Sequence, residues 1–126
     1  MFKKIDHVEI VPSNPEKTIR FYEILGFNLK SRHKIDVRPL KEVIYLELGG
    51  AIIEILNVEK LFASSREQWQ VGYRGIAIEV ENMDKAVNYL KTKGIVITWG
   101  PMDLGNSIRA EIKDPDNLAV ELRQWK

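Results

Sequence analysis

The stretch HVEIVPSNPEKTIRFYEILGF (residues 7–27) decides the fold, because a related stretch, GIAIEVENMDKAVNYLKTKGI (residues 75–95), follows it later in the chain. The two align without a gap at an offset of 75 − 7 = 68 positions, which places Asn14 on Asn82. Most apolar positions match in kind as well. The chain therefore reads as a tandem of two related modules.

A second pair of segments, residues 44–57 and 111–124, aligns at almost the same offset (121 − 54 = 67) and places Glu54 on Glu121. Both glutamates fall at interior positions of predicted strands. Two modules of one design, with polar groups at equivalent strand positions, predict a site on the pseudo-twofold axis that relates them.

Local patterns give each module the order strand, helix, strand, strand, strand. Alternating β-branched residues predict the strands. Ser13 or Asn14 caps the first helix, Gly26 ends it, and the glycine pair 49–50 predicts a tight hairpin turn. The predicted strands are 5–11, 27–35, 42–48, 51–57, 73–80, 95–99, 107–113 and 118–123, with helices at 15–25 and 82–93 and a loop at 100–106. The fold class is therefore α+β, with two βαβββ modules.

Length and composition predict one soluble domain, residues 1–126, with module one at 1–57, a connector at 58–72 that has room for one helical turn, and module two at 73–126. A net charge of +1 gives no electrostatic footprint for a nucleic-acid partner. No apolar run approaches the ~18 residues of a membrane span, and no leader-like segment opens the chain. With no cysteine, the composition fits a reducing compartment, so we expect a cytoplasmic protein.

Glu54 and Glu121 stand out because each interrupts a run of apolar residues, AIIEIL and LAVEL. Such runs are typical of strands covered on both faces, so each carboxylate is expected to be at least partly buried. A buried carboxylate needs a cation or a proton. One interpretation is a structural ion pair across the sheet, with Arg38, Arg74 and Arg109 as candidate partners. The other is a shared cation site, favoured by the repeat-equivalent positions.

His7 is the third member of the predicted site. It has the strand parity of Glu9, so both are expected on the face away from the helix. Imidazole nitrogen and carboxylate oxygen suit a divalent ion such as Zn²⁺, Ni²⁺, Mn²⁺ or Fe²⁺. By repeat symmetry the fourth position is residue 75, which is Gly75 and offers no side chain. His33 is an alternative donor on the second strand, although its Lys- and Arg-rich surroundings favour a surface role.

These residues carry a resemblance to a known family. The opening IDHVEIV, the helix end FYEILGF, the strand GGAIIEIL, the segment GYRGIAIEV and the closing DPDNLAVEL, in this order, resemble the vicinal-oxygen-chelate superfamily. That group includes glyoxalase I, methylmalonyl-CoA epimerase, extradiol dioxygenases and bleomycin- or fosfomycin-resistance proteins. The resemblance implies paired βαβββ modules curled into a half-open, mixed-sheet cup.

The resemblance also implies which residues act. The family's four ligand positions fall on His7, Glu54, Gly75 and Glu121, where glyoxalase-like members usually have a histidine at the position of Gly75. The Glu121 position serves in glyoxalase I as a metal ligand and proton shuttle, so Glu121 is the expected general base.

Three functions follow from the resemblance. The first is a glyoxalase I-like lyase or isomerase that uses a divalent metal and an enediolate to convert a small oxygenated metabolite. The second is a metal-free protein that binds a small molecule, as bleomycin-resistance proteins do, and Gly75 favours it. The third is an epimerase acting on an acyl-CoA. A homodimer is implied by the resemblance alone.

Secondary candidates are aromatic and basic residues that could contact a small ligand. Trp69, Trp99 and Trp125 could stack on a flat compound, although such residues are more often core or interface. Arg38 and Arg109 could clamp a carboxylate or phosphate, although solvated surface or pairing with acids is the commoner role.

Overall fold

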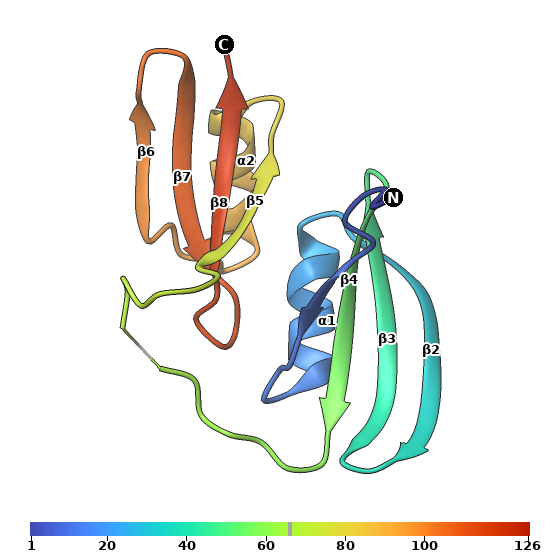
Figure 1. The fold of residues 1–126 in the computed structure, drawn as a ribbon. Coiled ribbons are helices and arrows are strands. Elements are labelled where there is room, and N and C mark those ends of the chain that lie inside the picture. The colour runs from blue at the N-terminus through green and yellow to red at the C-terminus, as the bar shows by residue number, and fades with distance from the viewer. Residues whose placement is uncertain (66) are drawn as a thin grey trace. The chain divides into compact units, whose positions relative to one another are not determined.

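The computed structural model describes residues 1–65 and 67–126 (Figure 1). The chain divides into two compact units, Met1–Ser64 and Ser65–Lys126. This division falls within the predicted connector 58–72. The described residues between β4 and β5 contain no helix, and residues 68–69 form a turn.

The first unit has the order β1 (Val8–Ile10), α1 (Pro15–Ile24), β2 (Asn28–Val37), β3 (Leu40–Leu48) and β4 (Ala51–Val58). Its four strands lie in the order β1-β4-β3-β2. The β1 and β4 strands are parallel, and the other neighbours are antiparallel. The predicted hairpin at glycines 49–50 joins β3 to β4, with Leu48 opposite Ala51.

The second unit repeats this order with β5 (Gly75–Glu79), α2 (Met83–Thr92), β6 (Trp99–Asp103), β7 (Ser107–Lys113) and β8 (Ala119–Trp125). The strand order is β5-β8-β7-β6, again with one parallel and two antiparallel pairs. The duplicated βαβββ order and the α+β class are therefore confirmed. Both sheets are open rather than closed into a barrel.

The two helices begin in the same way. Asn14 and Asn82, which the repeat aligns, are the N-caps of α1 and α2. Each side chain accepts a hydrogen bond from the backbone N–H three residues later, at 3.2 Å from Lys17 N and 2.9 Å from Lys85 N. These bonds satisfy N–H groups that the helix itself leaves without a partner.

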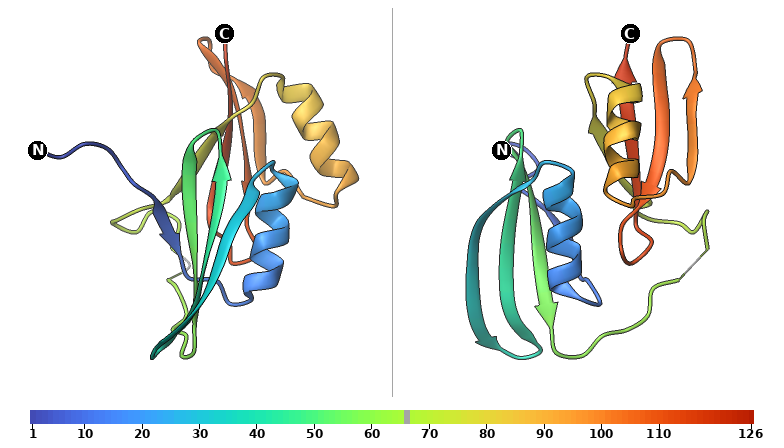
Figure 2. Two further views of the ribbon diagram at one scale, coloured as in Figure 1. Left: turned by 90° about the vertical axis from the view of Figure 1, so that its right-hand side faces the viewer. Right: turned by 180° about the vertical axis from the view of Figure 1, so that it is seen from behind.

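Each helix covers one face of its own sheet (Figure 2). Buried apolar side chains of helix and sheet meet there, including Ile19, Tyr22, Ile44, Leu46, Ile53 and Ile55 in the first unit and Met83, Leu90, Ala110, Ile112, Val120 and Leu122 in the second. Because strand side chains alternate between faces, Glu54 and Glu121 point to the uncovered face of their sheets.

The second strand of the second unit, β6, lies later in the sequence than predicted. The sequence predicts a strand at 95–99 and a loop at 100–106, whereas β6 runs over Trp99–Asp103. The prediction is wrong because Gly100 and Pro101 are residue types that usually end a strand. Here they lie in an edge strand, where a proline without an N–H is tolerated, and the ladder with β7 is irregular at that point.

The β1 strand is shorter than the predicted strand 5–11. Its ladder with β4 spans only Val8 to Ile10, since β1 is an edge strand with a single neighbour. His7 therefore lies immediately before the strand rather than inside it. Among the described residues, neither α1 nor α2 has the length or apolar character needed to cross a bilayer.

Candidate metal centre

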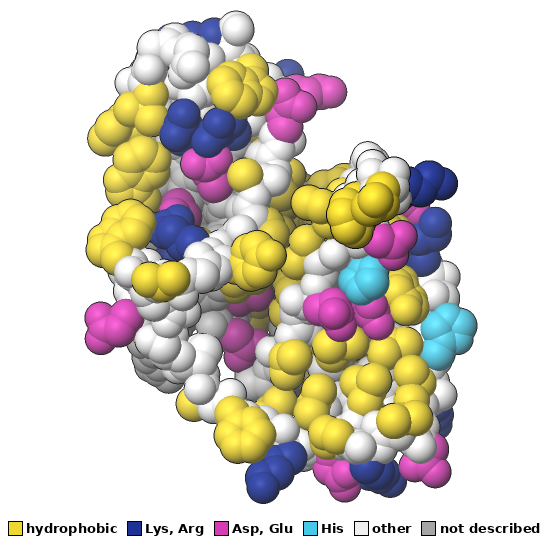
Figure 3. All heavy atoms as spheres, viewed as in Figure 1, with side chains coloured by type: hydrophobic (Ala, Val, Ile, Leu, Met, Phe, Trp, Pro, Cys, Tyr) yellow, Lys and Arg dark blue, Asp and Glu magenta, His cyan; other side chains and the backbone are white. Residues whose placement is uncertain are grey.

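The uncovered face of the first sheet brings three polar side chains into a row. Glu9 on β1 is the register partner of Glu54 on β4, and Glu54 is in turn opposite Tyr45 on β3. Side chains of opposed residues share a face, so the three lie next to one another. His7 precedes Glu9 by two positions and completes the group. Figure 3 shows a histidine surrounded by acidic side chains on this surface.

The His7 ring lies between two carboxylates. Its Nδ1 is 2.8 Å from Oδ2 of Asp6, and its Nε2 is 2.8 Å from Oε2 of Glu54. The hydrogen bond with Asp6 raises the pKa of His7, and the charge of Glu54 adds to this effect against partial desolvation. The same hydrogen bond lowers the pKa of Asp6. In the absence of another cation, the charged imidazolium that donates from both nitrogens is favoured.

Glu54 is the buried carboxylate of the group, with 8% of the residue exposed. Its partners are the His7 ring and the phenol of Tyr45, which hydrogen-bonds to it. Burial raises the pKa of Tyr45, and the charge and hydrogen bond of Glu54 raise it further. The prediction that Glu54 is buried is therefore confirmed, and its partner is an imidazole rather than a guanidinium.

The group also has the composition of a metal site. Ligand atoms of His7, Glu9 and Glu54 lie within 4.8 Å of one another. Ligands at 2.0–2.2 Å from one tetrahedral ion are separated by about 3.4 Å. The His7 and Glu54 atoms, 2.8 Å apart, would therefore separate slightly around an ion, which side-chain rotation can supply. One nitrogen and two oxygen donors fit a divalent ion such as Zn²⁺, Ni²⁺, Mn²⁺ or Fe²⁺.

Glu121 lies in the second unit on β8, at the position equivalent to Glu54. Its register partners are Ala77 on β5 and Glu111 on β7. Oε2 of Glu121 accepts a hydrogen bond from Nε of Arg123 at 3.0 Å and forms an ion pair with a terminal nitrogen of the same guanidinium at 2.9 Å. The side chain is 27% exposed, in line with the expected partial burial.

The arginines predicted as partners of the two glutamates have other roles. Arg38 pairs with Asp36 and Glu59. Arg74 binds Glu111 through two nitrogens and lies over the ring of Trp69, while Arg109 donates to Ser107. This part of the ion-pair interpretation is wrong, because the fold places a nearer cation, His7 or Arg123, beside each glutamate.

Gly75 has a structural reason for lacking a side chain. It lies opposite Ala119 in the parallel pair of β5 and β8. A Cβ at this position would lie 2.1 Å from the carbonyl oxygen of Ala119 and 2.9 Å from its Cβ. Because a real carbon atom cannot approach backbone so closely, this strand pairing leaves no room for a histidine at the fourth ligand position.

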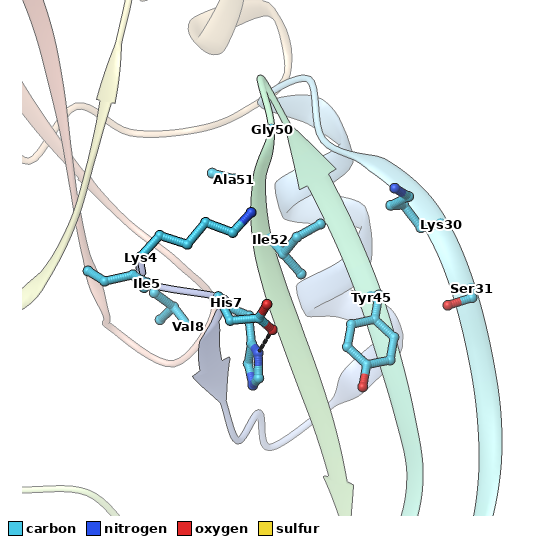
Figure 4. Close-up of a pocket in the computed structure, with 11 residues that line it drawn as sticks. Lys4, Ile5, His7, Val8, Lys30, Ser31, Tyr45, Gly50, Ala51 and Ile52 are labelled. Atoms are coloured by element: carbon cyan, nitrogen blue, oxygen red, sulfur yellow. Dashed lines mark hydrogen bonds and ion pairs between the residues drawn. The ribbon is translucent and has the colours of Figure 1, made fainter. Parts of the chain in front are cut away.

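An open pocket of about 480 Å³ adjoins the histidine in the first unit. Figure 4 shows His7 and Tyr45 at one end and Lys30 at the other, with Ile52 between them. Lys30 is held by Glu47 at 2.7 Å. A small molecule bound in this pocket could place its oxygen atoms against both the imidazole of His7 and the phenol of Tyr45.

Two residues of the site were not predicted, although the sequence carried a signal for both. Tyr45 lies opposite Glu54 as soon as the hairpin turns at glycines 49–50 and pairs Leu48 with Ala51. Asp6 is the neighbour of His7 along the chain, and its carboxylate bonds to the ring of that adjacent residue. His33 lies edge-on to Tyr45, with ring centroids 6.2 Å apart, and does not belong to the three-ligand group.

Duplicated βαβββ units, with an imidazole and carboxylates on an uncovered sheet face, define a protein of the vicinal-oxygen-chelate class. The profile of the Glyoxalase/Bleomycin resistance protein/Dioxygenase superfamily matches residues 4–122, and the chain belongs to this superfamily. It is 30% identical over 124 residues to a probable lactoylglutathione lyase of Synechocystis sp., a match that covers 94% of this chain and 92% of the relative.

Solved structures agree with this assignment. A glyoxalase family protein from Enterococcus faecalis superimposes with a TM-score of 0.82 at 29% identity, covering 97% of this chain and 98% of that one. TnmS3, an antibiotic-binding protein from Streptomyces sp. CB03234, superimposes with a TM-score of 0.75 at 21% identity, covering 99% and 98% of the two chains, and shares the fold.

Proposed function

We propose that this protein is a metal-dependent lyase or isomerase similar to lactoylglutathione lyase, acting on a small oxygenated metabolite such as a thiol adduct of a 2-oxoaldehyde. The observation that carries the proposal is the convergence of His7, Glu9 and Glu54 ligand atoms within 4.8 Å. The relative in Synechocystis, which matches nearly the full chain, supports the reaction class. A homodimer and a cytoplasmic location belong to the same proposal.

His7 and Glu54 are the proposed metal ligands from the first unit, and Glu9 is the further ligand that this structure suggests. Glu121 is the proposed ligand from the second unit. When bound, a divalent ion polarises a substrate carbonyl and stabilises negative charge on its oxygen. His7 loses its Nε2 proton when it becomes a ligand, while Asp6 keeps hold of Nδ1 and fixes the ring orientation.

Glu121 is also the proposed general base. It accepts a proton from the carbon next to the substrate carbonyl and returns it to the neighbouring carbon, so that the hydrogen is moved without net loss. Arg123 donates a hydrogen bond to Glu121 and so holds the carboxylate in place. Because one carboxylate oxygen carries the contacts with Arg123, the second oxygen has capacity for the substrate.

The proposal is tested by metal analysis and an activity assay on the same preparations. Protein purified without chelator is expected to hold about one metal per chain. It should form a thioester from the adduct of methylglyoxal and glutathione when supplied with Ni²⁺, Zn²⁺, Mn²⁺ or Fe²⁺. His7→Ala and Glu54→Gln should lose both metal and turnover, whereas Glu79→Gln, which removes an exposed carboxylate of β5, should keep both.

Two further variants test whether a carboxylate acts as a metal ligand or as the base: Glu121→Gln, at the proposed base, and Glu9→Gln, at the further proposed ligand. Loss of turnover in Glu121→Gln with metal retained identifies a base, and loss of both identifies a ligand. An ion at about 100 times its Kd adds about 2.7 kcal/mol to the free energy of unfolding. A protein that is purified without metal, and whose thermal midpoint does not change with any of the four ions, would therefore contradict the proposal.

A metal-free binding protein is the second candidate, and Gly75 favours it. The structure has no space for a fourth ligand side chain there, and His7 and Glu54 already neutralise one another. The fold shared with the antibiotic-binding protein TnmS3 is compatible with this role. Saturable binding of a small aromatic compound by metal-free protein, with no turnover under any ion, would favour this candidate.

A further inference from the structure

Two arginines lie side by side on the uncovered face of the second sheet. Arg109 on β7 and Arg123 on β8 are direct register partners, so their side chains project from the same face. Both residues are half-buried. Like charges directly opposite one another destabilise an antiparallel pair, so this arrangement calls for a negative partner.

The two guanidinium groups differ in what they already bind. Arg123 is paired with Glu121 and lies over the ring of Trp125 at 4.9 Å. Arg109 donates from Nε to the hydroxyl of Ser107 at 3.2 Å. Within residues 1–65 and 67–126, no carboxylate lies within ion-pair distance of Arg109. Its terminal nitrogens therefore remain available to an acceptor from outside the chain.

The other acids on this face do not fill that role. Glu111 is bound by Arg74 at 3.0 Å and by Lys113 at 2.8 Å. Glu79 is opposite Arg123 on the far side from Arg109 and is exposed. The uncompensated charge of the face is thus concentrated at Arg109, next to the guanidinium of Arg123.

Partly exposed apolar side chains flank the arginine pair. Met102 on β6 is opposite Arg109, and Trp99 is opposite Glu111. Trp125 is two residues beyond Arg123 on the same face. Their exposed fractions are 46%, 44% and 49%, large for side chains of this size. Figure 3 shows basic and acidic side chains bordered by hydrophobic ones on the second unit.

We propose that Arg109 and Arg123 form a binding site for the carboxylate or phosphate group of a small aromatic anion, whose ring packs against Trp125 and Trp99. Guanidinium groups bind planar oxyanions through two parallel hydrogen bonds, which an ammonium cannot reproduce. Aromatic rings beside the pair supply apolar contact and lower the local dielectric constant. The site lies wholly in the second unit, and anion binding to it needs no metal, although Arg123 also contacts Glu121 of the proposed function.

The test uses the full chain without added metal and three probes: benzoate, phenyl phosphate and the neutral benzamide. Binding is measured by calorimetry and by the indole N–H signals of the three tryptophans in NMR spectra. Saturable binding of benzoate, phenyl phosphate or both is expected, with the signals of Trp125 and Trp99 shifting, and benzamide is expected not to bind. The stronger of the two anions identifies the preferred acidic group.

Arg109→Gln and Arg123→Gln should each weaken binding of the preferred anion about tenfold or more, equivalent to about 1.4 kcal/mol. Arg109→Lys, which keeps the charge and guards against a folding defect, should lose part of the affinity. The matched control is Arg38→Gln, which removes an exposed arginine of the first unit. Equal affinity in Arg109→Gln and wild type, equal binding of benzamide, a shift confined to Trp69, or no saturable binding would each overturn the proposal.

Discussion

Nε2 of His7 lies 2.8 Å from Oε2 of Glu54, on the uncovered face of the first sheet. The pair joins a residue that precedes an edge strand to one at the centre of the sheet. The opposite nitrogen of the ring is bonded to Asp6 at 2.8 Å. The imidazole is thereby fixed at both ends before any ligand arrives, and the following predictions begin from this arrangement.

Asp6 is expected to position His7 for metal binding rather than to bind the metal itself. Asp6→Asn removes the acceptor charge that orients the ring, so metal affinity should fall about 10- to 100-fold. The affinity is measured by competition with a chromogenic chelator. Asp36→Asn, which changes an exposed aspartate of β2, serves as the control and should leave affinity unchanged. Equal affinity in Asp6→Asn and wild type would contradict this role.

The repeated helix caps are expected to make equal contributions to stability. Asn14→Ala and Asn82→Ala should each lower the free energy of unfolding by about 1 kcal/mol, because each leaves a backbone N–H without its acceptor. Urea denaturation monitored by circular dichroism gives this value. Asn14→Asp and Asn82→Asp keep the acceptor and should be nearly neutral. A loss confined to one of the two helices would show that the caps are not equivalent.

Gly75 is expected to tolerate no side chain. Gly75→Ala forces β5 away from β8, because the added carbon would meet the carbonyl oxygen of Ala119, and should destabilise the protein by about 1–3 kcal/mol or more. The matched control is Ala77→Ser, which adds one atom two positions further along the same strand. Denaturant midpoints measure the difference. A Gly75→Ala protein as stable as wild type would mean that the strands separate at little cost.

Glu42 is expected to make stability depend on pH. Two hydrogen bonds of 3.0 Å from Arg32 hold the pKa of Glu42 below its ordinary value, against partial burial that acts in the other direction. A lowered folded-state pKa gives stability that is present above the unfolded pKa and lost as the pH falls through the folded value. Glu42→Gln should therefore cost about 1–2 kcal/mol at pH 7 and almost nothing at low pH.

The measurement for Glu42 is urea denaturation of wild type and Glu42→Gln at pH 7 and near pH 3. The control is Glu23→Gln, since Glu23 is an exposed residue of α1 that makes no ion pair with another described residue. A difference between wild type and Glu42→Gln that stays constant across this range would show that the charge of Glu42 contributes nothing.

Most of the fold could be predicted from the internal repeat and the local patterns within it. Helix starts, the glycine hairpin and the order of strands and helix along each module were predicted because caps, turns and alternation are local signals. The β6 strand was misplaced because Pro101 is read as a break when the sequence does not reveal that its strand lies at a sheet edge. Edge position is a property of the whole sheet, which local patterns do not contain.

His7 and Glu54 were predicted as site residues, but their direct contact was not, and Asp6 and Tyr45 were missed. Burial of Glu54 followed from the apolar run around it, and the proximity of His7 followed from strand parity. The contact of Glu121 with Arg123 was missed because residues two apart on a strand share a face, and long side chains can bend back along it. The need for a glycine at position 75 could not be predicted, because it follows from the short distance between the backbones of β5 and β8.

The proline in β6 has a consequence for behaviour at high concentration. An outer strand with a continuous row of free amide hydrogens can recruit a strand from another molecule and begin polymer growth. Pro101 lacks that hydrogen, so the ladder available to a newcomer is interrupted within a strand of five residues. Replacing it with a β-branched residue would restore the row of amide hydrogens along this edge and favour strand pairing between molecules.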